Sequence, residues 1–143
     1  MSLVDTNAVL RAYLVNLVLP PVPFVQPLYV LVGDRVYCPR LPENATLPAV
    51  GFFTRGGAST PYIPDIPTPS VQFDCWAQSP IEAREVYRLL YDALQGLQNQ
   101  PVAIGLVDYY ILSAREEVQG QDLMDIDIPD KFRVLTFFEI KFR

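Results

Sequence analysis

Two stretches of the sequence alternate between apolar and polar residues with the two-residue period of a β-strand. In residues 71–77 the odd positions are apolar and share one face, with Gln72, Asp74 and Trp76 on the other. Residues 132–142 alternate in the same way, and their shared face carries the apolar side chains of Phe132, Val134, Phe138, Ile140 and Phe142. Each stretch is therefore predicted to be a strand with one buried face.

Two other stretches show the spacing of a helix. Residues 2–19 repeat apolar side chains every three or four positions, with Asp5 near the start, where a helix dipole favours negative charge. Residues 79–95 carry a stronger signal. Serine, proline and glutamate at 79, 80 and 82 form a capping pattern, and Gly96 is placed to end the helix. Its inward-facing residues are expected to be Ala83, Val86, Tyr87, Leu90 and Leu94.

The first half of the chain offers shorter apolar runs. Residues 28–32 and 35–38 are predicted to be two strands joined by a hairpin at Gly33 and Asp34. Residues 49–54 also have the character of a strand.

The second half holds one long apolar run and one acidic segment. Residues 102–112 are predicted to be a buried strand with a bend at Gly105. Residues 120–129 are expected to be a loop. Carboxylates in and beside this loop could be proposed as a calcium site, but their spacing does not fit an EF-hand, so a solvated acidic loop is the favoured interpretation: Asp122, Asp125, Asp127 and Asp130.

Prolines divide the chain, because 11 of the 14 lie between Pro20 and Pro69. Residues 20–27 are expected to be a stiff connector. Residues 55–69 have no periodicity and begin with a hinge at Gly56 and Gly57, which predicts a long proline-rich loop or arm. The pattern as a whole predicts a single α+β domain over residues 1–143, with an antiparallel or mixed sheet packed against two helices.

Composition, net charge and the absence of common motifs argue against several classes of protein. The chain has no histidine, a formal net charge of −5, and none of the common catalytic or phosphate-binding motifs. These features argue against an enzyme, a His-ligated metal, a bound cofactor and a protein whose main task is to grip nucleic acid. The two cysteines, Cys38 and Cys75, are far apart in sequence and are expected to be small buried side chains.

The start of the chain does not have the pattern of a signal peptide. The apolar residues at 3–19 are interrupted by Asp5, Arg11 and Asn16, and they fall short of a membrane span. A soluble, intracellular protein without a membrane partner is therefore expected.

The order of the elements carries more information than any single residue. A leading helix is followed by VYCPRLPENATLP at 36–48, VQFDCW at 71–76, a capped helix with Glu82 and Ala83 near its start, and PDKFR at 129–133 before the final strand. This order resembles the small tail-completion, or tail-terminator, proteins of long-tailed bacteriophages. The resemblance extends over nearly the whole chain.

The resemblance implies an α+β subunit that closes into a ring, generally a hexamer. Such a ring caps the tail tube and joins it to the connector or stopper complex of the head. The protein would then be assembled in the host cytoplasm and lie in the neck of the virion, and phage DNA would pass through the lumen without specific binding. Two alternatives stay open: a head-completion or stopper protein of the same neck, and an unrelated module that binds a small ligand.

Two segments are expected to contact partners. Residues 55–69 carry the apolar side chains Tyr62, Ile63 and Ile66, which we expect to dock on a neighbouring subunit or on the tail tube; alternatively, they fold back over their own sheet. The final strand ends at the chain terminus and is expected to be a free sheet edge that pairs between subunits. Its candidate contacts are Phe132, Val134, Thr136 and Phe138.

Overall fold

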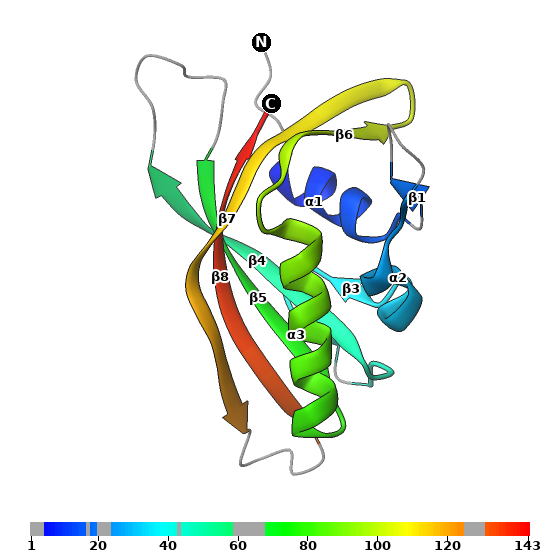
Figure 1. The fold of residues 1–143 in the computed structure, drawn as a ribbon, viewed down its shortest axis with the longest axis vertical. Coiled ribbons are helices and arrows are strands. Elements are labelled where there is room, and N and C mark those ends of the chain that lie inside the picture. Colours follow the sequence, from blue (N-terminus) through cyan, green and yellow to red (C-terminus); the bar gives the residue numbers. More distant parts are fainter. Residues whose placement is uncertain (1–4, 17, 20–23, 43, 59–67, 125–130) are drawn as a thin grey trace.

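A computed structural model describes residues 5–16, 18–19, 24–42, 44–58, 68–124 and 131–143. Within them the chain forms one α+β domain with three helices and a six-stranded mixed sheet. The helices α1 (Thr6–Leu14), α2 (Pro27–Val32) and α3 (Pro80–Leu94) lie on the same side of the sheet (Figure 1). The predicted single α+β domain with a mixed sheet is thus confirmed, with three helices where the sequence predicts two.

The large sheet has the strand order β3-β4-β5-β8-β7-β6. Its strands are β3 (Val36–Tyr37), β4 (Ala49–Ala58), β5 (Thr68–Ala77), β6 (Gln98–Ile104), β7 (Val107–Met124) and β8 (Phe132–Phe142). Only the pairing of β3 with β4 is parallel, and all other neighbours are antiparallel. A separate small ladder joins β1 (Val18–Leu19) to β2 (Phe24–Val25).

The core lies between α3 and the inner faces of β5 and β8. The predicted alternation holds in both strands, because the odd positions of β5 and the even positions of β8 from Val134 to Phe142 are buried. Phe73 of β5 lies edge-on to Phe138 of β8, with ring centroids 5.6 Å apart. The predicted helix stripe is buried at Ala83, Val86, Leu90 and Leu94, and Tyr87 is half-buried.

Helix α3 begins where its sequence predicts and ends within one residue of the predicted position. The Ser79 hydroxyl accepts a hydrogen bond from the Glu82 amide at 3.2 Å, and Pro80 occupies the first turn. The helix ends at Leu94, one residue earlier than predicted, and Gly96 follows with a positive φ of 81°.

Helix α1 is shorter than the predicted helix at 2–19. Its start is capped by Asp5, which accepts from the Ala8 amide at 3.2 Å. Beyond its end, the buried side chain of Gln26 donates from Nε2 to the carbonyl oxygens of Leu14 (2.9 Å) and Asn16 (3.1 Å). Because Gln26 satisfies carbonyls that a longer helix would have used, the chain can turn into β1.

The predicted hairpin at 28–38 is wrong. Residues 27–32 form helix α2, with Pro27 in its first turn, and Leu28 and Val32 bury one face four residues apart. Gly33 ends this helix with a φ of 57°, and only Val36–Tyr37 forms a strand. A short apolar run fits a helix and a strand equally well, and the proline decided between them.

Two further predictions in the second half are corrected. Residues 102–112 are not one buried strand but the two arms of a β6–β7 hairpin that turns at Gly105 and Leu106. The predicted loop at 120–129 is wrong for its first five residues, because 120–124 belong to β7 and 121–124 pair with β8. Residues 125–130 lie outside the described residues, and with them most of the proposed acidic loop.

The proline-rich half is only partly described. The strand predicted at 49–54 continues to Ala58 with an irregular register between Thr54 and Gly57, where Gly56 has a φ of 91°. Residues 55–58 and 68–69 of the predicted loop belong to β4 and β5, and residues 59–67 lie outside the described residues. Cys75 is buried as expected, but Cys38 is exposed, which corrects that prediction.

Candidate assembly surface

The structure corrects the predicted contact strand. Strand β8 lies in the middle of the sheet between β5 and β7, so the prediction that it is a free edge is wrong. Val134, Thr136 and Phe138 are buried in the subunit's own core, and Phe132 is half-buried against it. The other predicted contacts, Tyr62, Ile63 and Ile66, lie outside the described residues.

Thr136 is buried because its hydroxyl belongs to a polar network that holds β7 in place. The hydroxyl lies 2.9 Å from both Glu116 Oε2 and the Val118 carbonyl oxygen, and Glu116 Oε2 also accepts from the Tyr87 hydroxyl at 2.6 Å. The amide of Gly120 donates to the Tyr87 oxygen at 3.1 Å.

This network coincides with the irregular part of β7. The register between β7 and β8 shifts at Glu116/Val118 and again at Val118/Gln121. Partial burial and the bond to Glu116 raise the pKa of Tyr87. Gly120 permits the close packing, since a Cβ there would lie 2.7 Å from the Tyr87 ring. The network therefore fixes the bulges that curl the sheet.

An apolar surface appears instead on the β6–β7 hairpin. Its tip carries Ile104, Leu106 and Val107, which are 37%, 104% and 52% exposed. We call these three residues the hairpin tip. The base of the hairpin is anchored through the buried residues Val102 and Ile111.

The β6–β7 hairpin closes through a two-residue turn, Gly105–Leu106. Gly105 has a φ of 63°, whereas Leu106 is not among the described non-glycine residues with positive φ, which fits a type II′ turn. In a two-residue hairpin the flanking pair Ile104–Val107 exchanges hydrogen bonds, and alternate pairs follow. Pro101, opposite Tyr110, then lies at a position whose missing N–H would face outward, so the free edge of β6 is blunted.

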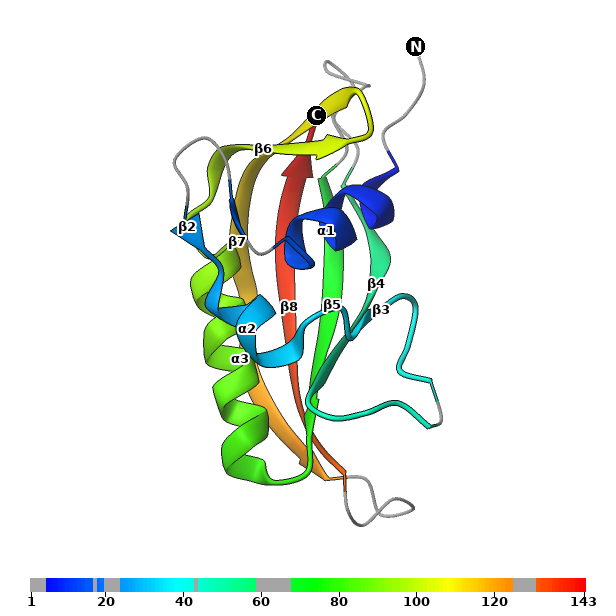
Figure 2. The same cartoon turned by 90° about the vertical axis from the view of Figure 1, so that its right-hand side faces the viewer.

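A second apolar surface lies on β2 and α2. Val25 and Val30 are exposed there, and we call these two residues the α2 surface. Both lie in stretches of sequence that are poor in charge: residues 12–33 contain no charged side chain and residues 95–114 contain only Asp108. This low charge was the signal in the sequence that could have located both. Elements β2, α2 and β6 share the side of the molecule that faces the viewer in Figure 2.

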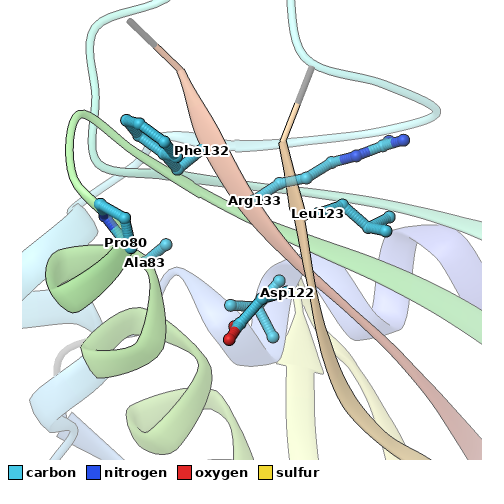
Figure 3. Close-up of a pocket in the computed structure, with 7 residues that line it drawn as sticks. Pro80, Ala83, Asp122, Leu123, Phe132 and Arg133 are labelled. Atoms are coloured by element: carbon cyan, nitrogen blue, oxygen red, sulfur yellow. The ribbon is translucent and has the colours of Figure 1, made fainter. Parts of the chain in front are cut away.

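An apolar cavity of about 170 Å³ lies at the N-terminal end of α3. Figure 3 shows Pro80 and Ala83 of the helix on one side, with Phe132 and Asp122 nearby on β8 and β7. Arg84 pairs with Asp122 at 3.3 Å. Within the described residues, no group of three or more His, Cys, Asp or Glu side chains is placed to hold a metal.

Residues of the sequence motifs at 71–76 and 129–133 meet on the sheet face away from the helices. The guanidinium of Arg133 lies 5.3 Å from the Trp76 ring centroid and 3.6 Å from Asp74 Oδ1. Burial raises the pKa of Asp74, although Arg133 and Gln72 oppose that rise. The backbone of Arg40 and Leu41 crosses the same face at Gly51, where a Cβ would lie 3.4 Å from the Leu41 nitrogen. These motif residues therefore tie β5 to β8.

No helix in the described part of the chain is long and apolar enough to cross a membrane. No protein-family model and no curated protein sequence matches the chain. Among solved structures, the fold is similar to that of a chain in the virion of a native gene transfer agent (GTA) particle. The two chains are 14% identical with a TM-score of 0.54, and the match covers 81% of this chain and 84% of the other.

Proposed function

We propose that this protein is a structural subunit of a phage-like virion, and that it forms a ring that ends the tail tube and joins it to the head connector. The observation that carries the proposal is the shared fold. It spans 81% of this chain and 84% of a chain from a virion particle, so it covers nearly a whole subunit on each side. The motif order at 36–48, 71–76 and 129–133 favours the tail-terminator role within that class.

The surface of the subunit supports an assembly role. Exposed aliphatic side chains occur at the hairpin tip, on β2 and on α2, where they contribute little to the monomer's own core. The net charge of −5 is compatible with DNA passing through a lumen without being held. We propose no catalytic step and no cofactor.

The test is negative-stain electron microscopy of the purified protein, alone and mixed with tail tubes from the same phage. The proposal predicts rings of uniform size and tubes closed by a ring at one end. Native mass spectrometry gives the number of subunits, for which a hexamer is expected. A protein that binds the head connector but never the tube would instead be a stopper, and a strict monomer that binds neither would contradict the proposal.

A further inference from the structure

The hairpin tip and the α2 surface are two separate apolar surfaces on one subunit. We propose that the hairpin tip of one copy docks on the α2 surface of a second copy, and that this contact is repeated around the ring. The inference rests on the proposed ring function and names the surfaces that would build the ring. Leu106, which is fully exposed, is its anchor.

Charge selects a second copy as the occupant. The chain carries −5 overall, so two copies carry like net charge and a contact between them is favoured where few charged residues are brought together. The α2 surface lies in a stretch of sequence without any charged residue, and residues 95–114 around the hairpin contain only Asp108. These two stretches of chain add little like charge of their own to a contact between identical subunits, and a charge-depleted apolar core is typical of protein interfaces.

The contact is made by side chains and not by the addition of a strand. Pro101 removes the outward N–H in the middle of β6, so a neighbouring strand could not continue a regular ladder there. The turn at Gly105 instead presents Leu106 and its two neighbours as a compact apolar knob.

The placement of the two surfaces makes the contact heterologous. In Figure 2 the yellow turn of the β6–β7 hairpin lies at the upper right, whereas β2 and α2 lie to the left. Two different surfaces of one chain that bind each other can repeat from copy to copy, and they give a closed ring when the rotation closes. A self-complementary patch would stop at a dimer.

The tip supplies an anchor and not the entire interface. A stable interface buries on the order of 800 Å² per partner, more than three side chains provide. A few central apolar residues nevertheless dominate the affinity of most interfaces. Substitution of Leu106 should therefore have a large effect on assembly and little effect on the fold.

The first experiment compares Leu106→Asp and Val30→Asp with Ile81→Asp as the matched control. Ile81 is 84% exposed in the first turn of α3, outside both surfaces, and an aspartate is tolerated at a helix start. Val25→Asp is a second α2-surface variant should Val30→Asp disturb the helix. Assembly is followed by native mass spectrometry and by ring counts on tail tubes, and folding by circular dichroism.

We expect the Leu106 and α2-surface variants to need at least about tenfold more protein for half-maximal assembly, as loss of a central interface residue does. The Ile81 variant should assemble like the wild type. If the wild type forms rings and Leu106→Asp forms them equally well, the inference is overturned and the ring function stands. A wild-type protein that forms no ring, alone or on tubes, would overturn both.

Mixing the two defective variants tests the direction of the contact. Val30→Asp keeps an intact hairpin tip and Leu106→Asp keeps an intact α2 surface, so together they can form one sound junction. The next junction would join two altered surfaces, and assembly should stop at heterodimers. Rings in the mixture, or no pairing at all while wild-type rings form, would exclude this contact.

A disulfide trap then identifies the pair directly. Leu106→Cys and Val30→Cys are made separately in a Cys38→Ser background, because Cys38 is exposed and Cys75 is buried. Oxidation of the mixture should link the two proteins, and oxidation of either protein alone should not. Efficient linking of Leu106→Cys to itself would show a symmetric tip-to-tip contact and contradict the proposal.

Discussion

The β5–β8 pair and the β6–β7 hairpin are both antiparallel and both rich in apolar residues, yet one is core and the other is surface. In β5 and β8 every second side chain from Val71 to Ala77 and from Val134 to Phe142 is buried, all of them apolar except Thr136, and the intervening side chains are more polar. In the hairpin the apolar residues run on through the turn, and of its paired residues from 98 to 113 only Val102 and Ile111 are buried. Alternation, and not apolar content, therefore distinguishes the core strands.

The difference also separates stability from assembly. Residues of the β5–β8 pair contribute through burial inside the subunit, so changes there should unfold it. Residues of the hairpin tip are exposed in the monomer, so changes there should leave the monomer's free energy of unfolding nearly unaltered. The predictions below test this separation.

The largest effect is expected from proline in the central strand. Thr136→Pro removes a ladder donor from β8 and the hydroxyl that meets Glu116, so we expect no cooperative unfolding transition by circular dichroism. Ala103→Pro, in the edge strand β6, places proline where the N–H faces outward and should cost about 1 kcal/mol or less. A folded Thr136→Pro protein that only fails to assemble would restore the discarded edge assignment.

The second-largest loss of stability is expected from a substitution that leaves a cavity in the core. Phe138→Ala removes a fully buried ring that packs on Phe73, and we expect it to lower the free energy of unfolding by about 3–5 kcal/mol in urea titrations. Leu106→Ala is the matched truncation at the hairpin tip and should change it by less than about 0.5 kcal/mol. Similar losses in both variants would show that the tip belongs to the monomer's core.

These two regions also show how far the sequence predicts the structure. The strands β5 and β8 and the helix α3 follow from local signals, namely alternation and the cap at Ser79. The position of β8 in the sheet does not, because strand order depends on long-range pairing with β5 and β7 that no local pattern specifies.

The N-terminal third was harder for a different reason. The end of α1 depends on Gln26, which lies twelve residues beyond Leu14 and caps carbonyls that sequence periodicity alone would have kept in the helix. At 27–32 a short apolar run was compatible with both helix and strand. At the hairpin tip, a continuous run of apolar residues predicts a buried strand by its hydrophobicity, whereas the scarcity of charge along 95–114 is the feature that fits an exposed contact surface.

The buried phenol of Tyr13, in the layer of helices over the sheet, gives a pH test of intermediate size. Tyr13 of α1 is buried and donates to the Ala93 carbonyl oxygen at 2.5 Å, and burial raises its pKa from 10.0 to about 12. The phenol therefore stabilises the fold fully below pH 10, and about 2–3 kcal/mol is lost as the pH rises from 10 to 12.

Urea titrations at pH 8, 10 and 12 measure that loss. Tyr13→Phe should make the fall in stability between pH 10 and 12 shallower. A fall should remain, because burial also raises the pKa of the Cys75 thiol and because the pKa of Tyr87 is raised as well. A Tyr13→Phe protein with the same slope as the wild type would mean that the Tyr13 phenol does not contribute to the loss.

The smallest effect on the free energy of unfolding is expected from loss of the Ser79 cap, which is the local signal that predicts the start of α3. The Ser79 hydroxyl satisfies the Glu82 amide at 3.2 Å at the start of α3, the helix that covers β5 and β8. Ser79→Ala should therefore cost about 1 kcal/mol, whereas Gln78→Ala, at the exposed residue just before the cap, should be nearly neutral. Both values come from urea titrations at pH 7.

Because the β6–β7 hairpin does not depend on this helix start, Leu106→Asp should impair ring assembly to the same degree in the Ser79→Ala background. A larger assembly defect in the double variant would show that the two regions are coupled through α3 and do not act separately.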